Sequence, residues 1–94
     1  MSTPDQDRSP VWCFSVFAAA EASVMPRVLA EFAKRGLCPL RFDGAVAGDD
    51  LTVDVQVEGL EAEVAAHVAE RLRGAVHVER VLTAVKRRAR EAVA

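Results

Sequence analysis

The side chains that could do acid–base, nucleophilic or metal chemistry are few in this 94-residue chain. His67 and His77 belong to no Ser/His/Asp set and no HExxH motif, and the chain has no Gly-rich phosphate loop. Cys13 and Cys38 form no CxxC pair and have no histidines clustered around them, so we expect reduced, packed thiols. The aspartates are expected in turns and on the surface: Asp43, Asp49, Asp50 and Asp54. The sequence therefore predicts no catalytic residue, no metal site and no bound cofactor.

Composition limits the remaining classes of protein. The chain is 51% hydrophobic, so it can bury a core, but its length predicts one small domain that is modestly stable alone. A net charge of −2, with both signs interspersed, argues against a nucleic-acid binder. No apolar run approaches the roughly 20 residues of a membrane span. Residues 1–10 lack a hydrophobic signal core and are expected to be a disordered leader, which places the chain in the cytoplasm.

Two stretches have the pattern of central strands. Residues 11–18, VWCFSVFA, are β-branched or aromatic and apolar on both faces, which is typical of the middle of a sheet. Residues 51–57 alternate Leu and Val with Thr, Asp and Gln, which is typical of a strand with one wet face.

Two further stretches have helical periodicity. Ser23 to Leu37 has a possible N-cap in Ser23, a stop in Gly36, and an apolar stripe of Met25, Val28, Leu29, Phe32 and Ala33. Residues 61–73 carry a second stripe of Val64, Ala65, Val68, Ala69 and Leu72, with Gly74 as the stop.

The remaining segments complete the domain, which we expect over residues 11–85. Residues 40–47 suit an edge strand with a bulge at Gly44, and residues 75–85 suit a last strand with His77 on the open sheet face. Residues 86–94 form a basic tail. The order β-α-β-β-α-β predicts an α+β, ferredoxin-like fold: a four-stranded antiparallel sheet in the order 4-1-3-2 with both helices on one face.

That fold serves many functions, and three of them lack their residues here. The loop after the first strand, AAAEAS, has neither the paired cysteines of copper carriers nor the arginine of acylphosphatases. The central strands offer only Phe17 and Trp12 for the base stacking that RNA-binding domains use. A weaker nucleic-acid contact through Lys86, Arg87, Arg88 and Arg90 stays open.

One resemblance covers residues 11–82. A strand and a short loop followed by PRVLAEFAKRGL and a second strand is similar to the ACT domain family, with matching positions at Pro26, Val28, Leu29, Phe32, Arg35 and Gly36. Within that family the chain most resembles the short, single-ACT form of the small regulatory subunits of acetolactate synthase. The supporting features are the length, the RVL in the helix, the Arg-Gly ending and the closing strand VHVERV.

The resemblance implies a non-catalytic regulatory role. ACT domains pair and bind a small amino acid at the interface, where helix N-terminal N–H groups attract the ligand carboxylate. The corresponding positions are Val24, Met25 and Arg27 in the loop, and Cys38 and Pro39 in the segment of a partner. We therefore expect a homodimer that activates an acetolactate synthase large subunit in branched-chain amino-acid biosynthesis. The alternative is a free-standing dimer that senses an amino acid or a similar metabolite.

Overall fold

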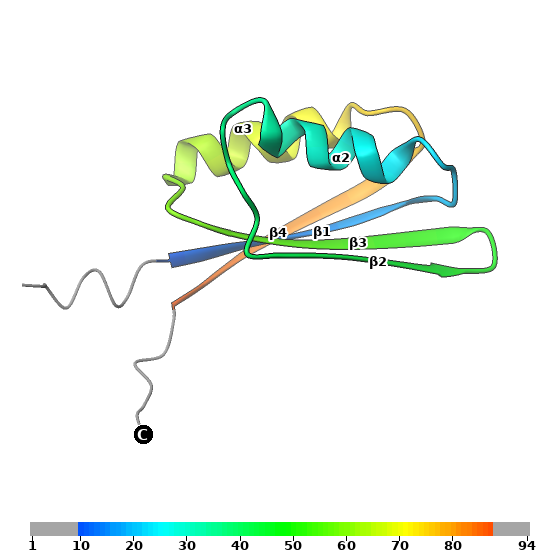
Figure 1. Cartoon of the computed structure of the whole chain (residues 1–94), viewed down its shortest axis with the longest axis horizontal. Helices are drawn as coiled ribbons and strands as arrows, with labels where there is room; N and C mark the ends of the chain where they lie inside the picture. Colours follow the sequence, from blue (N-terminus) through cyan, green and yellow to red (C-terminus); the bar gives the residue numbers. More distant parts are fainter. Residues whose placement is uncertain (1–9, 88–94) are drawn as a thin grey trace, which may run out of the picture.

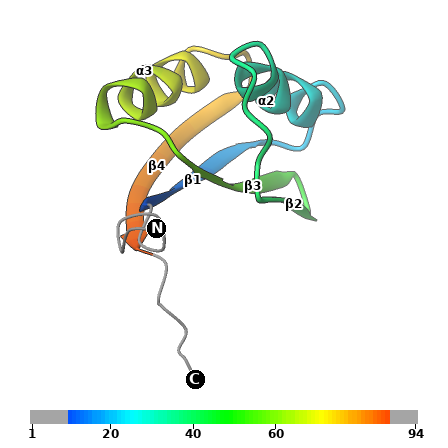
Figure 2. The same ribbon diagram turned by 60° about the vertical axis from the view of Figure 1, so that its left-hand side comes forward.

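The computed structural model describes residues 10–87, which form four strands and two helices. The elements are β1 (Pro10–Ala19), α2 (Val24–Ala33), β2 (Arg41–Ala47), β3 (Asp50–Glu58), α3 (Ala62–Arg73) and β4 (Val78–Arg87). The strands make one antiparallel sheet in the order β2-β3-β1-β4, and both helices lie on the same face of it (Figure 1). The predicted fold is confirmed. Figure 2 shows how the sheet twists beneath the two helices.

The ends of the domain differ slightly from the prediction. Pro10 already belongs to β1, and Lys86 and Arg87 belong to β4, which pairs with β1 as far as Pro10. The rest of the expected leader and basic tail lies outside the described residues. Within the described part of the chain, neither helix is long and apolar enough to cross a membrane.

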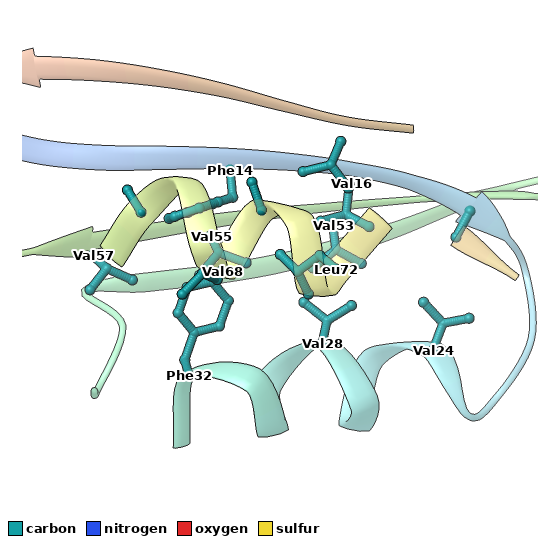
Figure 3. Packing of buried hydrophobic residues seen from close by; sticks show 14 of the residues in the cluster. Phe14, Val16, Val24, Val28, Phe32, Val53, Val55, Val57, Val68 and Leu72 are labelled. Carbon is teal, nitrogen blue, oxygen red and sulfur yellow. The ribbon is translucent and has the colours of Figure 1, made fainter. Parts of the chain in front are cut away.

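The core lies between the sheet and the helices. The helix-facing side chains of the two central strands are almost completely buried: Phe14, Val16, Ala18, Leu51, Val53, Val55 and Val57. Phe14 meets Phe32 of α2 edge-on, with ring centroids 5.2 Å apart (Figure 3). Full burial of each such large side chain contributes about 1.5–3 kcal/mol, so the two central strands and the helices above them hold the fold together.

The apolar stripe of α2 is narrower than predicted. Val24, Val28 and Phe32 point into the core (Figure 3), whereas Met25 and Leu29 are 36% and 41% exposed. Ala33, the last member of the expected stripe, is also exposed. The helix thus buries one row of side chains, at positions i, i+4 and i+8. The neighbouring row, on the side of the edge strand β2, stays exposed.

The ends of α2 follow the prediction only in part. Ser23 precedes the helix but its hydroxyl makes no capping hydrogen bond, because its backbone is already helical (φ −79°, ψ −11°) rather than extended. The C-terminal prediction is confirmed. Gly36 has φ +73°, a conformation that favours glycine, and the N–H of Leu37 donates to the carbonyl oxygen of Phe32 at 3.0 Å.

Helix α3 buries Ala65, Val68, Ala69 and Leu72, but Val64 is 39% exposed, so its predicted place in the stripe is wrong. Val64 lies in the first turn, beside a surface depression of about 530 Å³ next to Leu60 and His67 rather than above the sheet.

The start of β4 also departs from the prediction. His77 lies in the turn before the strand with φ +74°, not on the open sheet face. A bulge then shifts the register: Phe17 pairs with Arg80 and Ala18 with Val78, which leaves Glu79 unpaired. In a regular strand Val78 and Val81, three residues apart, would face opposite sides of the sheet. The bulge explains why both pack against the core.

Strand β2 contains no bulge at Gly44, since its pairing with β3 runs unbroken from Arg41 to Ala47. The glycine has another purpose. A Cβ atom at Gly44 would lie 2.5 Å from Sδ of Met25, so the missing side chain makes room for Met25 where α2 crosses the edge strand.

Candidate functional site

The five predicted site residues do not come together within one chain. Val24 is a core residue, 1% exposed, and its N–H donates to the carbonyl oxygen of Glu21 at 3.1 Å. Neither its side chain nor its backbone donor is available to a ligand. Val24 is the first residue of α2, and its side chain belongs to the core.

Met25 and Arg27 lie on different sides of α2. Met25 packs over Gly44 at the β2 edge, and no hydrogen bond to its backbone N–H is found within residues 10–87. Arg27 instead borders a depression of about 290 Å³ together with Glu70 and Arg71 of α3. Only Met25 thus faces the surface where the prediction puts the ligand.

The depression beside Arg27 is closed on one side by a cluster of ion pairs that joins the two helices. Glu31 accepts from Nη1 of Arg35 at 3.0 Å and from Nζ of Lys34 at 3.2 Å, and Nε of Arg71 lies 3.8 Å away. Burial of the Glu31 carboxylate, the largest single effect, raises its pKa. The hydrogen bonds from Arg35 and Lys34, with the charges of Lys34 and Arg71, outweigh burial and lower the pKa below its ordinary value.

Cys38 and Pro39 lie at the other end of α2, before β2 begins. Cys38 is exposed and Pro39 is half-buried. The start of α2 lies at the opposite end, where the N–H of Ala20 donates to the carbonyl oxygen of Asp49 in the β2–β3 turn at 2.9 Å. The length of α2 therefore separates the two halves of the predicted site within one chain.

One flank of the domain is apolar and unpaired. Four large hydrophobic side chains are exposed along the outer side of α2 and the adjoining edge strand: Met25, Leu29, Leu40 and Val46. Val46, on β2, is 62% exposed. We call this surface the β2 flank. The sequence analysis placed Met25 and Leu29 in the apolar stripe of the helix. The one signal against this was that both lie beside, not within, the i, i+4, i+8 series that begins at Val24.

The opposite edge of the sheet is protected. Nη2 of Arg73, at the end of α3, donates to the carbonyl oxygen of Val81 on β4 at 2.9 Å. The same arginine is held by Glu70, whose Oε2 lies 2.9 Å from Nη1. A charged side chain that covers part of an edge strand discourages the addition of another strand there. The two edges of the sheet are therefore not equivalent, since β4 is covered at Val81 and β2 has no such contact within residues 10–87.

The described residues contain no arrangement for metal chemistry, since no three His, Cys, Asp or Glu side chains among residues 10–87 are grouped closely enough to hold an ion. The surface near the predicted site consists of an unpaired strand edge, exposed apolar side chains and the N-terminus of α2.

A family model described as an ACT-like domain matches residues 5–89. The chain belongs to the ACT-like domain family. ACT domains are regulatory modules, and this one has their β-α-β-β-α-β order, as the resemblance implied.

Solved structures agree with this assignment at the level of fold. The C-terminal domain of the MgtC protein from Mycobacterium tuberculosis is 15% identical, with a TM-score of 0.70 over 95% of this chain and 99% of that one. The ACT domain of the GTP pyrophosphokinase of Chlorobium tepidum is 8% identical, with a TM-score of 0.70 over 79% and 96%. The regulatory subunit of aspartate kinase from Thermus thermophilus is 14% identical, with a TM-score of 0.64 over 81% and 50%. A search of curated protein sequences finds no significant match.

Proposed function

We propose that this ACT-like domain is a non-catalytic regulatory subunit of the cytoplasm that works as a homodimer joined through β2. The observation that carries the proposal is the β2 flank, where an unpaired strand edge coincides with the exposed side chains of Met25, Leu29 and Val46. Antiparallel pairing of two β2 strands would supply the missing backbone hydrogen bonds and bury apolar surface at about 25 cal/mol per Å². The protected edge of β4 leaves β2 as the favoured site of pairing.

This pairing would also assemble the predicted ligand site. In two antiparallel β2 strands centred on Gly44, Arg41 of one chain stands opposite Ala47 of the other. The segment Cys38–Pro39 of one subunit then approaches the start of α2 in its partner, where the N–H of Met25 has no hydrogen bond within the described residues. Such a donor suits a ligand carboxylate. Arg27 would stand apart from this pocket, on the α3 side of the helix.

The enzyme that we propose as the target is acetolactate synthase. The support is the resemblance to its small subunits, which rests on the RVL sequence in α2, the Arg-Gly ending of that helix and the closing strand. Thiamine diphosphate and flavin would then belong to the large subunit, and this chain would carry neither. The test is co-purification with an acetolactate synthase large subunit and an assay of its activity. We expect binding and a rise in activity. If a folded domain neither binds the large subunit nor raises its activity, acetolactate synthase is excluded as the target.

The alternative is a free-standing dimer that senses an amino acid, and the unbonded N–H of Met25 is the observation that favours it. Thermal-shift measurements across the amino acids separate the two candidates. Stabilisation by one amino acid, without binding to the large subunit, would favour the sensor. A flat profile together with activation of the synthase would favour the regulatory subunit.

A further inference from the structure

The sheet face that the helices leave open has a depression of about 560 Å³ near the β2–β3 hairpin. It is bordered by Phe17, Thr52, Asp50, Glu79 and Arg80, all of them from one chain. Its volume lies within the range of small-molecule sites. It is distinct from the interface site proposed above and needs no second subunit.

The register of the sheet explains the hollow. Directly paired residues point to the same face, so Arg80, Phe17 and Thr52 form one row across the open side of β4, β1 and β3. The next row toward the hairpin consists of Ala19 and Asp50, followed by Ala47 of β2. Alanines beside larger side chains leave a concave surface between the rows.

Arg80 places a positive charge at the β4 side of the hollow. Cζ of Arg80 lies over the Phe17 ring, 4.5 Å from its centroid. No salt bridge to Arg80 is found in the part of the chain that the structure describes, so its N–H groups remain able to hold a carboxylate from outside. The stacked guanidinium also covers the ring face that a nucleobase would need.

One negative charge lies at the opposite end, and a second lies next to Arg80. Asp50 stands two strands away from Arg80, roughly 10 Å across the sheet at the usual strand spacing. Glu79, which the bulge leaves unpaired, directly precedes Arg80 in the chain and borders the same depression. The three groups together carry one positive and two negative charges, so a ligand with one negative and two positive groups would neutralise them.

We propose that this depression binds a basic amino acid: its carboxylate at Arg80, its α-ammonium at Glu79, and its distal cation at Asp50, with the aliphatic chain over the alanines. An extended lysine or arginine side chain has the length that the separation of Arg80 and Asp50 requires. The proposal concerns a single chain and stands whether or not the domain dimerises through β2.

The test is an NMR titration of the isotope-labelled full chain with L-lysine. We expect amide shifts at Ala19, Thr52 and Arg80. Norleucine, which lacks the distal cation, and cadaverine, which lacks the carboxylate, should each bind at least about tenfold more weakly, since each loses one charge-assisted contact. No shift with lysine or arginine, or shifts confined to Met25 and Cys38, would overturn the proposal.

Variants locate the binding. Arg80→Gln and Asp50→Asn should each weaken lysine binding by about tenfold or more. Asp54→Asn is the matched control, because Asp54 lies on the same open face of β3, outside the hollow, and its replacement should leave binding unchanged. Amide spectra report whether each variant is folded. Equal binding by a folded Arg80→Gln variant would contradict the assignment.

Discussion

The guanidinium of Arg73 donates a hydrogen bond to the backbone carbonyl oxygen of Val81, 2.9 Å away, and so ties the last turn of α3 to the edge strand β4. The contact occupies a backbone acceptor that an incoming strand would use, and it puts a positive charge on that edge. No comparable contact protects β2 among residues 10–87, where the ion pair between Arg41 and Asp43 stays within one strand. One arginine thus makes the two edges of the sheet unequal.

Removal of this arginine should expose the β4 edge. We expect Arg73→Ala to lower the free energy of unfolding by about 1 kcal/mol, the usual contribution of one hydrogen bond, and to accelerate amide exchange in β4. It should also promote self-association beyond the dimer. Urea unfolding, hydrogen exchange and light scattering measure these effects.

The matched control is Glu70→Gln. It weakens the ion pair with Arg73 but leaves the contact between Arg73 and Val81 in place. We expect little change in stability, because exposed ion pairs contribute about 0–1 kcal/mol. An equal effect of both variants on β4 exchange would show that the charge pair, not the bond to Val81, protects the edge.

The Glu31 cluster predicts a pH dependence. Since the pKa of Glu31 is lower in the folded chain than its ordinary value, the unfolded chain takes up this proton first as the pH falls. Its stabilising contribution is therefore complete above the ordinary carboxyl pKa and is lost as the pH falls through the lowered one. We expect Glu31→Gln to destabilise the domain by about 1–3 kcal/mol at neutral pH and by much less in acid.

Chemical unfolding of both proteins at several pH values measures this difference. Glu63→Gln is a suitable control, since Glu63 is exposed in the first turn of α3 and has no ion pair within the described residues. A difference between wild type and Glu31→Gln that stays constant down to strongly acidic pH would contradict the assigned role.

The fit between Met25 and Gly44 can be tested by a double-mutant cycle. Gly44→Ala should force Met25 to turn outward, because the new Cβ would lie 2.5 Å from its Sδ atom. We expect a cost of about 1 kcal/mol, at the low end for overpacking, since Met25 is partly exposed and can move. In a Met25→Ala background the same substitution should cost nothing. An unchanged cost in that background would mean that the strand itself, not Met25, requires glycine.

The sequence predicted the fold because independent local patterns agreed. The alternation from Leu51 to Val57 identified β3, and Gly36 identified the end of α2; each depends only on neighbouring residues. The errors have a tertiary cause. Met25 and Leu29 satisfy helical periodicity, but the sheet beneath α2 ends at β2, so their side of the helix has nothing to cover it. The inward and outward side chains of β4 do not alternate regularly because the strand contains a bulge, and no single residue in the sequence indicates that bulge.

The candidate site was predicted less well than the fold. The family pattern located the start of α2 correctly, but it could not show that Val24 turns inward or that Arg27 faces α3. The contact between Arg80 and Phe17 was also not predicted. Cζ of Arg80 lies 4.5 Å from the centroid of the Phe17 ring because β1 and β4 pair in this register. Contacts between strands distant in sequence need the topology first.

The most direct test of the account is the mass in solution of the wild-type chain and two variants, measured by sedimentation velocity over a range of concentrations. Val46→Asp puts a charge into the β2 flank, and Val85→Asp makes the same change at a comparably exposed position on β4. We predict a dimeric wild type, a monomeric but folded Val46→Asp, and a dimeric Val85→Asp. A monomeric wild type, or a dimer that Val85→Asp disrupts and Val46→Asp does not, would contradict pairing through β2.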